Sequence, residues 1–481
     1  MTRVLAVASE VFPLVKTGGL ADVVGALPAA VKGHGIDMRV LIPGYPAVMA
    51  AVTAGETVHR VKDLFGGPGR LIDATVGELH LLVLDAPHLF DRPGNPYLGP
   101  DGKDWPDNWK RFGALSKIAG DVGRGAVPAF VADIIHGHDW QAGLAPAYLR
   151  FAEGAKAKTV LTIHNLAFQG NFPATVFPQL GLPAESFTID GIEYWGGVGY
   201  LKGGLQFADA ITTVSPTYAE EICTPSGGMG LDGVLRQRHS VLSGIVNGVD
   251  TDIWNPETDT ALAANYTSTT LGRRTINKRE IEKRFGLAPG NKMLFCVVSR
   301  LAWQKGMDLL GECIDALVSA GARLAVLGSG DAALEGLFRA ATARHRGRVG
   351  VVTGYDEPLA HLLQGGSDAI LIPSRFEPCG LTQFYGLRYG CVPVVARVGG
   401  LADTIIDAND AALSAGVATG VQFSPVEAPA LQRAITRAIS LYDHRQSWRT
   451  IQKRGMRSDV SWTKGAASYA ALYRKLAASG S

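Results

Sequence analysis

The chain has 481 residues, 59 glycines and a formal net charge of +2 at pH 7. It is too long for one hydrophobic core, so two large domains are predicted. Because 46 Lys and Arg face 44 Asp and Glu, bulk charge gives no basis for binding nucleic acid or a membrane, and any anion must be held by local geometry. The glycines stand beside apolar runs, which favours an α/β fold.

The cysteines and apolar runs indicate a cytoplasmic protein. Five cysteines are present, and no two form a Cys-x-x-Cys pair of the kind used by zinc or redox sites. The first apolar run, at 4–8, is too short for a secretory peptide, and no later run approaches the ~20 residues of a membrane span. We therefore expect a soluble protein in a reducing compartment.

Apolar runs alternate with helical patterns through both halves of the chain. The expected strands of the first half lie at 4–8, 39–42, 81–84, 133–136, 159–164 and 210–214, with a clear helix at 20–32. The expected strands of the second half lie at 293–299, 323–327, 349–352, 369–372 and 392–396, with helices at 307–319 and 381–389. A turn at 245–250 separates the two halves. We predict α/β Rossmann-like domains over 1–245 and 246–460, followed by an amphipathic helix within 461–481.

The first motif reads Lys-Thr-Gly-Gly-Leu-Ala-Asp-Val at 16–23, between the first expected strand and the first expected helix. Gly18 and Gly19 would let backbone amides approach an anion, the helix N-terminus favours negative charge, and Lys16 adds a mobile cation. The alternative is a plain tight turn with a solvated lysine. No Gly-x-x-x-x-Gly-Lys-Ser/Thr run occurs, so a Walker A loop is excluded.

Two strand ends in the second half carry charged groups. Arg300 and Lys305 follow the strand expected at 293–299, and Glu377 follows the strand expected at 369–372. Parallel sheets bind ligands at the carboxyl ends of their strands, so these groups should meet in one crevice. Glycines at 306, 328–330 and 399–400 add backbone amides for phosphate oxygens. Two cations for a diphosphate and one acid for a polyol suggest a sugar nucleotide, although strand-end basic residues are more often just solvated.

With these motifs, the whole chain resembles the bacterial glycogen synthase and plant starch synthase family. Further matching segments are His-Gly-His-Asp-Trp at 136–140, the segment 162–170, Asn-Gly-Val-Asp at 247–250 and Glu-Pro-Cys-Gly-Leu-Thr at 377–382. The resemblance implies two Rossmann-like domains facing a deep cleft (the GT-B fold). It also implies a retaining glucosyltransferase that moves glucose from ADP-glucose to the non-reducing 4-OH end of an α-1,4-glucan such as glycogen, with release of ADP.

The resemblance implies further properties of the protein. Neither a metal nor another cofactor is expected, the domains close over the donor, and the C-terminal helix returns to the N-terminal domain. Arg300 and Lys305 would stabilise the departing diphosphate, Glu377 would lie by the glucose hydroxyls, and His164 would line the sugar pocket. Asp139 would orient the sugar, the acceptor or neighbouring side chains. For His164, a histidine that simply caps a strand end is the alternative.

Other matched positions are assigned by resemblance to donor binding: Lys16, Gly18, Gly19, Asp22, Tyr97, Asn247, Tyr355, Cys379, Gly380, Leu381 and Thr382. Tyr355 directly follows an expected strand and is placed to stack on the nucleobase, with edge packing as the alternative. By composition alone, Tyr97 is an ordinary loop aromatic.

Related retaining transferases often carry a second acid eight positions after the residue that matches Glu377. Here Tyr385 occupies that position, which weakens any mechanism based on that pair of carboxylates. The resemblance instead implies that the departing phosphate accepts the proton of the attacking 4-hydroxyl on the same face of the sugar.

Three patterns look like metal or dinucleotide sites but are not interpreted as such. We expect His136 and His138 to point to opposite sides of their strand end, so that no shared metal ion is expected. The Asp-Thr-Asp segment at 250–252 resembles a metal-binding pair of acids, but it belongs to the turn that begins at Asn247. The Gly-x-Gly-x-x-Gly run at 228–233 follows no strand and therefore lacks the context of a dinucleotide site.

Two other functions stay open. The same scaffold serves retaining transferases with a uridine donor and phosphorylases with a pyridoxal cofactor. A non-catalytic nucleotide or glucan sensor is the alternative from another class. Arg300, Lys305, Glu377 and His164 argue against a sensor, since a sensor needs no groups at a leaving oxygen.

Overall fold

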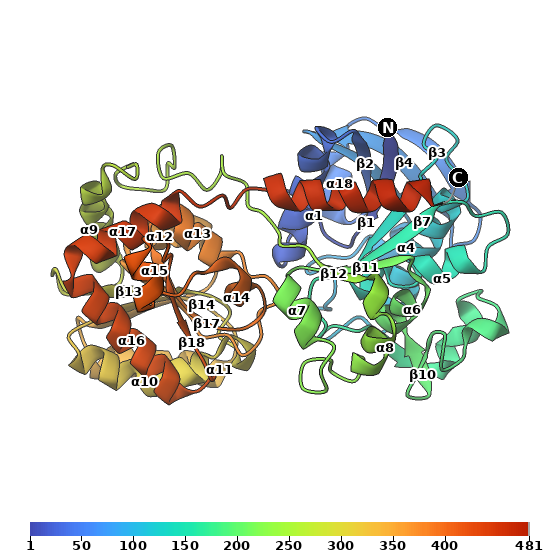
Figure 1. Ribbon diagram of the computed structural model, residues 1–481. Coiled ribbons are helices and arrows are strands. Elements are labelled where there is room, and N and C mark those ends of the chain that lie inside the picture. Colours follow the sequence, from blue (N-terminus) through green and yellow to red (C-terminus); the bar gives the residue numbers. More distant parts are fainter. Residues whose placement is uncertain (480–481) are drawn as a thin grey trace. The chain divides into compact units, whose positions relative to one another are not determined.

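The computed structural model describes residues 1–479 and divides the chain into two α/β units (Figure 1). Unit 1 comprises Met1–Gly248 together with the chain from Trp462 onward, and unit 2 comprises Val249–Ser461. The division falls in the turn at 245–250. Among the described residues no helix is both long and apolar enough to span a membrane, and all five cysteines are free.

Unit 1 is built on a sheet that, within residues 1–479, has nine strands in the order β12-β11-β7-β6-β1-β2-β5-β4-β3. These strands are β1 (Thr2–Val7), β2 (Ile36–Pro43), β3 (Glu56–Val61), β4 (Gly69–Val76), β5 (Leu79–Asp85), β6 (Ile134–His138), β7 (Lys158–Ile163), β11 (Ala210–Thr213) and β12 (Leu242–Gly244). A small second sheet holds β8 (Asn171–Pro173), β9 (Glu193–Tyr194) and β10 (Gly197–Gly199).

The α-helices of unit 1 are α1 (Gly19–Lys32), α2 (Pro46–Ala51), α3 (Pro87–Phe90), α4 (Asn108–Gly123), α5 (Ala145–Arg150), α6 (Tyr200–Phe207), α7 (Pro216–Glu221), α8 (Asp232–Gln237) and α18 (Thr463–Ala478). Short 3₁₀ helices lie at Trp140–Ala142, Ala174–Gln179, Ala184–Ser186 and His239–Val241. The strands β3, β4 and β5 pair antiparallel, and the rest of the large sheet is parallel.

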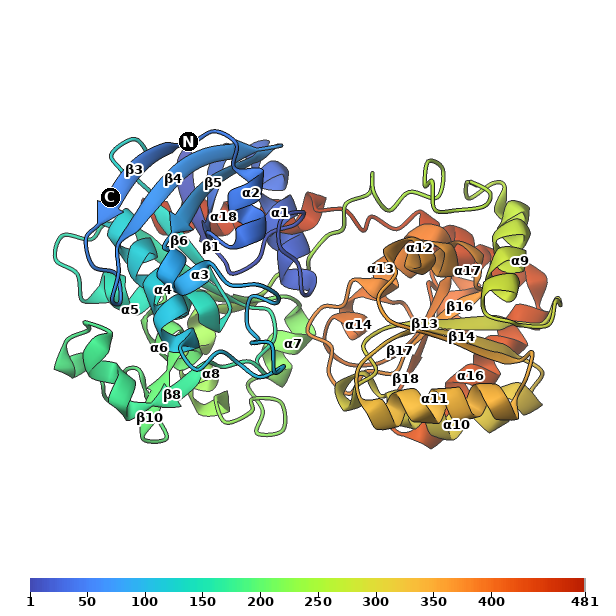
Figure 2. The same ribbon diagram turned by 180° about the vertical axis from the view of Figure 1, so that it is seen from behind.

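The antiparallel edge of unit 1, β3 and β4, was not expected from the sequence (Figure 2). Strand β3 reads Glu-Thr-Val-His-Arg-Val, and none of its residues is fully buried. It therefore lacks the alternation of apolar and polar residues that identifies a half-buried strand. Charged side chains on such an edge discourage pairing with a second molecule.

Helix α18 packs on α1 and on the face of β1 and β6 (Figure 1). Its buried side is a stripe of Ala466, Tyr469, Ala470 and Tyr473, the spacing of an amphipathic helix that covers a core. The Tyr473 hydroxyl lies 2.7 Å from Nδ1 of His136 on β6. The last helix of the chain is therefore joined to the strand that leads to the motif at 136–140.

Unit 2 holds a parallel sheet whose described strands run in the order β15-β14-β13-β16-β17-β18. They are β13 (Leu294–Val298), β14 (Arg323–Gly328), β15 (Val349–Thr353), β16 (Ala369–Ile372), β17 (Val392–Ala396) and β18 (Val421–Phe423). The helices are α9 (Arg274–Arg284), α10 (Met307–Ser319), α11 (Ala332–Arg344), α12 (Glu357–Gly366), α13 (Thr382–Tyr389), α14 (Gly399–Thr404), α15 (Asp410–Ser414), α16 (Ala428–Asp443) and α17 (Arg445–Met456), with 3₁₀ turns at Leu271–Arg273 and Trp303–Lys305.

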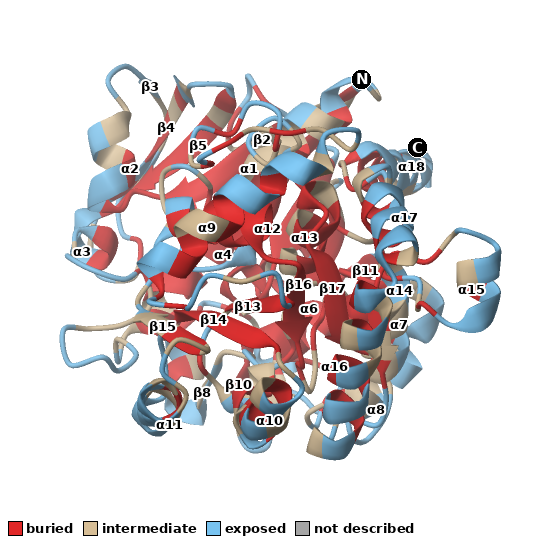
Figure 3. Cartoon of the chain, turned by 90° about the vertical axis from the view of Figure 1, so that its left-hand side faces the viewer, coloured by how far each residue is buried: buried red, intermediate tan, exposed pale blue. Residues whose placement is uncertain are grey.

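Helices cover both faces of the unit 2 sheet. Figure 2 shows α9, α12 and α13 on one face and α10, α11 and α16 on the other. The strands are buried, whereas the outward sides of the helices are exposed (Figure 3). In chain order the sheet reads 3-2-1-4-5-6, so strand order reverses between β13 and β16, which is where open parallel sheets bind ligands.

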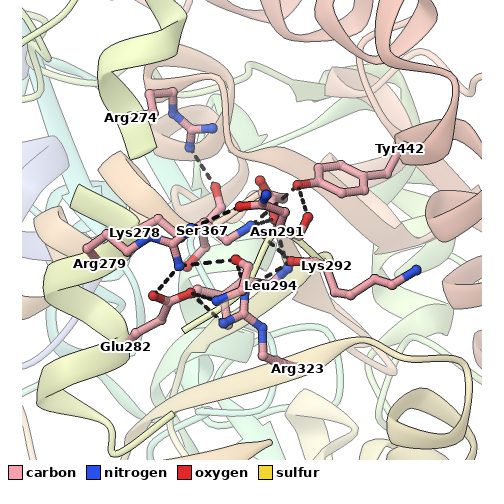
Figure 4. A network of polar contacts seen from close by, with 12 residues as sticks. Arg274, Lys278, Arg279, Glu282, Asn291, Lys292, Leu294, Arg323, Ser367 and Tyr442 are labelled. Atoms are coloured by element: carbon pink, nitrogen blue, oxygen red, sulfur yellow. Dashed lines mark hydrogen bonds and ion pairs between the residues drawn. The ribbon is translucent and has the colours of Figure 1, made fainter. Parts of the chain in front are cut away.

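Helix α9 is attached to this sheet by buried polar groups and not by an apolar stripe (Figure 4). Lys278 Nζ donates to Asp368 Oδ2 at 2.6 Å and to the Lys292 carbonyl at 3.0 Å. Arg323 is hydrogen-bonded and ion-paired with Glu282. Because a buried charge is tolerated only when it is paired, these contacts fix α9 in one position on the sheet.

Candidate functional site

In unit 2, the loops that follow β13 and β16 are joined to each other. The Arg375 amide donates to the Gln304 carbonyl at 2.8 Å, and Lys305 Nζ donates to Glu377 Oε2 at 2.6 Å. The structure therefore brings Lys305 and Glu377 together at the point where strand order reverses.

Glu377 is held in place from two directions. Its Oε2 accepts hydrogen bonds from Lys305 Nζ and, at 2.8 Å, from Ser374 Oγ. The residue is only 7% exposed, yet no described residue donates to its Oε1. Glu377 is therefore an oriented carboxylate with one oxygen left to accept hydrogen bonds from a ligand.

Arg300 is exposed, and among the described residues no carboxylate pairs with it. Its Nη2 lies 3.4 Å from Gln304 Oε1, and Gln304 Nε2 lies 3.4 Å from the Phe376 carbonyl. In contrast, the nearby Arg375 is bound at two points to Asp308, each at 2.7 Å. Arg300 thus supplies an uncompensated cation, whereas Arg375 is structural.

Two glycines allow the strand-end loops to approach closely. Gly306 has φ +66°, and a Cβ there would lie 2.0 Å from the Pro373 carbonyl oxygen. Gly399 has φ +42°, and its Cβ would lie 2.1 Å from the Glu377 carbonyl oxygen. Both positions combine a left-handed backbone with no room for a side chain, so they shape the site around Glu377.

The backbone amide of Gly330 is already bonded in the structure, and its contact with a phosphate stays a prediction. The Gly330 amide donates to Glu335 Oε1 at 3.1 Å, so it is directed at a side chain of its own unit.

Tyr355, which follows β15, is 76% exposed and its hydroxyl donates to Glu357 at 2.7 Å. That exposure is compatible with stacking on a ligand.

The segment 377–382 leads into α13, which begins at Thr382. Gln383 Nε2 donates to the carbonyls of Cys379 and Gly380, each at 2.9 Å. Gly380 has φ +73°, and Leu381 precedes the first residue of the helix without a side-chain cap. The buried Gln383 therefore fixes the loop that the sequence assigned to the donor.

Tyr385, on α13, takes part in packing. Its ring stacks on Trp254 with centroids 3.6 Å apart and planes 10° apart. Trp254 also stacks on His361 at 3.7 Å. The position that holds a second acid in related transferases thus anchors the first segment of unit 2.

In unit 1, the glycine-rich motif surrounds a buried carboxylate that sequence reasoning missed. Glu10 accepts hydrogen bonds from Thr17 Oγ1 at 2.6 Å and from the Gly18 amide at 3.3 Å, and it is bonded to the Tyr97 hydroxyl. The Gly18 amide is therefore already used, and the backbone there is extended (φ −158°). In the structure the Gly18 amide thus faces Glu10, and its contact with a donor phosphate stays a prediction.

Lys16 lies at the exposed edge of the same motif. Its Nζ is 2.9 Å from Asp22 Oδ1, so the two matched residues are paired with each other.

Asn247 also belongs to unit 1. Its buried side-chain oxygen, Oδ1, has no hydrogen-bond partner among the described residues. Contacts of Lys16, Asp22 and Asn247 with the donor therefore stay predictions.

A second cluster in unit 1 contains histidines at the ends of β6 and β7. The rings of His136 and His138 lie against each other with centroids 4.2 Å apart and planes tilted by 36°. The expectation that they point to opposite sides is wrong, because residues two apart on a strand share a face. His138 Nδ1 lies 2.9 Å from His164 Nε2. Over residues 1–479 no group of three His, Cys, Asp or Glu is arranged to hold a metal.

Asp139 lies beside this cluster in a strained backbone conformation, with φ +55°. Its Oδ1 accepts the His164 amide at 2.7 Å and the Asn165 amide at 3.4 Å. Burial raises the pKa of Asp139 to about 7, although the two amides act in the opposite direction. This carboxyl group therefore keeps its proton to a higher pH than an exposed aspartate does.

Replacing Asp139 by asparagine should change how stability depends on pH. The folded-state pKa of Asp139, about 7, lies above its usual value of 3.8, so its stabilising contribution is complete below pH ~4 and is lost as pH rises through 7. The unfolding free energy of Asp139→Asn, relative to the unchanged chain, should rise by roughly 2–4 kcal/mol from pH 4 to pH 8. Urea unfolding at both pH values measures it, and a difference independent of pH would show that the burial effect is absent.

Four supporting residues were missed by sequence reasoning: Glu10, His138, Ser374 and Gln383. A signal existed for three of them: Glu10 and Ser374 stand two residues after expected strands, and His138 lies within the matched segment 136–140. None existed for Gln383, whose role depends on a helix turning its side chain back onto the preceding loop.

Comparison with known proteins identifies both units. The family model "Starch synthase catalytic domain" matches residues 3–237, and "Glycosyl transferases group 1" matches residues 278–454. The chain is 59% identical to a glycogen synthase of Rhodopseudomonas palustris (strain BisA53) over 477 residues, which is 99% of this chain and 98% of that protein. It is 58% identical to a glycogen synthase of Mesorhizobium japonicum over 474 residues, 98% of each chain.

A solved structure also resembles the chain over almost its full length. The catalytic domain of Starch Synthase IV from Arabidopsis thaliana, bound to ADP and acarbose, superposes with a TM-score of 0.89 at 30% identity. The superposition covers 99% of both chains.

Proposed function

Because the chain belongs to the glycogen synthase and starch synthase family and is a glycosyltransferase of the GT-B fold, we propose that it uses ADP-glucose as donor. It transfers glucose with retention of configuration to the non-reducing 4-OH end of an α-1,4-glucan and releases ADP. Its place of action is the cytoplasm, which agrees with the five widely spaced cysteines.

The observation that carries this proposal is the arrangement of Arg300, Lys305 and Glu377 in unit 2. When the bond between the anomeric carbon and the diphosphate breaks, negative charge grows on the leaving oxygen. Within residues 1–479 no carboxylate pairs with Arg300, and the Lys305 ammonium is fixed by Glu377 at 2.6 Å. Cations held in place before the reaction stabilise such a leaving group more than the ground state. They also supply the positive charge that a metal ion provides elsewhere, so no metal is part of the proposal.

Glu377 acts on the other part of the donor. Its Oε1 accepts hydrogen bonds from glucose hydroxyls, and its negative charge stabilises the positive charge that develops at the anomeric carbon. Since Tyr385 is stacked on Trp254, its helix position offers no second carboxylate for a covalent intermediate. The new bond forms from the 4-oxygen of the acceptor to the anomeric carbon, and the 4-hydroxyl proton passes to the departing phosphate oxygen.

Unit 1 contributes the remaining contacts of this proposal. His164 and Asp139 meet the sugar, and Lys16, Asp22 and Tyr97 reach the donor phosphates or the loop that binds them. Support comes from their positions at the carboxyl ends of β1, β6 and β7 or in adjoining loops.

The donor is tested by supplying ADP-glucose and UDP-glucose separately with glycogen as acceptor. We expect kcat/KM at least ~10-fold higher with ADP-glucose, which is about 1.4 kcal/mol of discrimination, and a product with α-linked glucose by NMR. Faster transfer from UDP-glucose would contradict the choice of donor, and a β-linked product would contradict retention. A variant with Glu377 changed to Ala serves as the control for contaminating activity.

A further inference from the structure

His138 is fully buried and is not a residue to which the proposed mechanism gives a role. It ends β6, and His164 follows the neighbouring strand β7. A single hydrogen bond of 2.9 Å joins Nδ1 of His138 to Nε2 of His164. The direction of that bond decides which nitrogen of His164 carries a proton.

Both rings are neutral in the folded protein. Burial lowers the pKa of His164 to about 3 and holds the pKa of His138 well below its usual value. Each neutral imidazole has one N–H and one bare nitrogen. Only one proton can therefore lie between the two rings, and it belongs either to His138 or to His164.

The second nitrogen of His138 distinguishes these two arrangements. Its Nε2 is buried and has no hydrogen-bond partner among the described residues. If His164 were the donor, His138 would carry its own proton on that Nε2, and a buried N–H without an acceptor costs about 1–3 kcal/mol. If His138 is the donor, Nε2 is only a bare acceptor, and unmet acceptors are the more common of the two in native proteins.

Neighbouring groups hold the His138 ring in this orientation. The His136 ring packs against it with centroids 4.2 Å apart and planes tilted by 36°. His136 is itself bonded through Nδ1 to Tyr473 at 2.7 Å and through Nε2 to Thr162 Oγ1 at 2.6 Å. His136 therefore has both nitrogens occupied and forms a fixed support for His138.

We infer that His138 is a positioning residue, which donates Nδ1–H to His164 Nε2 and thereby holds His164 as the Nδ1–H tautomer. This rests on the proposed function only in its consequence for the reaction. His164 then presents an N–H donor to the sugar and has no free lone pair with which to act as a base. The proton of the attacking hydroxyl must leave by another route, which agrees with its transfer to the departing phosphate.

The tautomer is measured directly by NMR of the full chain labelled with ¹⁵N-histidine, without any substrate. His164→Gln identifies the His164 signals. We expect a proton on Nδ1 and a bare Nε2 at pH 7, the reverse of the tautomer that free imidazole side chains favour. A proton on His164 Nε2, or a doubly protonated ring, would overturn the inference whatever the enzyme's donor proves to be.

Two variants test the role of His138 in the reaction. His138→Asn retains a side-chain N–H near the position of Nδ1, whereas His138→Leu removes it. We expect His138→Leu to shift His164 toward the Nε2–H tautomer and to lower kcat about tenfold with little change in donor KM, and His138→Asn to restore much of both. His88→Leu, at an exposed histidine of unit 1, is the control. An unchanged tautomer in His138→Leu would overturn the inference.

Discussion

Replacing Glu377 by alanine is expected to lower kcat by about 10³-fold while the fold changes little. The carboxylate stabilises charge that exists only in the transition state, and loss of one such group commonly costs 10²–10⁴-fold. Lys305, whose side chain is 18% exposed, regains solvent when its partner is removed, so no charge is stranded in the core. Steady-state kinetics with ADP-glucose and thermal unfolding of the same preparation measure both effects.

Two further variants make this result specific. Glu377→Gln keeps the shape and the hydrogen-bonding oxygen but loses the charge, so it should be impaired nearly as much as Glu377→Ala. Glu280→Ala removes an acid from the partly exposed pair with Arg284 and should leave kcat unchanged. Full turnover in Glu377→Gln would show that the negative charge of Glu377 is not needed for catalysis.

Replacing Lys305 by alanine is expected to impair both donor binding and turnover. The ammonium contributes charge-assisted hydrogen bonds worth ~1.5–3 kcal/mol each, and removing one donor to a developing oxyanion lowers kcat by about 10²–10³-fold. The change also leaves the buried Glu377 carboxylate with Ser374 as its remaining described hydrogen-bond donor, so its orientation is lost as well. Separate measurement of KM for ADP-glucose and of kcat distinguishes the effect on donor binding from the effect on turnover.

The charge and the shape of Lys305 are separated by a matched pair of changes. Lys305→Arg retains a cation and should lose less activity than Lys305→Ala. Lys117→Ala breaks a lysine–acid pair of unit 1, with Asp121 at 3.1 Å, and should have no effect on kcat. Unimpaired turnover in Lys305→Ala would refute its assignment to the leaving group.

Much of the fold was predictable because buried parallel strands appear as short apolar runs. The bounds of α10, β16 and β17 agree with the expected segments 307–319, 369–372 and 392–396. The α/β class and the GT-B fold are confirmed. Strands β3, β4, β12 and β18 of the two large sheets were missed. Three of them, β3, β12 and β18, are edge strands, and β12 and β18 have only three residues each.

The candidate site was predictable in its position but not in its internal bonds. Because Lys305 and Glu377 both follow strands of a parallel sheet, the sequence predicts that they lie close together, and in the structure they are in contact. Nothing in the sequence showed that they pair directly, or that Glu10 fills the glycine-rich motif, because such pairing depends on side-chain reach across loops. The histidine rings were misplaced by a wrong use of strand periodicity, which places residues 136 and 138 on one face.

The most direct test is a crystal structure of the protein with ADP bound. The guanidinium of Arg300 and the ammonium of Lys305 should both lie within about 2.7–3.2 Å of diphosphate oxygens. A diphosphate bound elsewhere, with neither cation in contact, would contradict the proposed site.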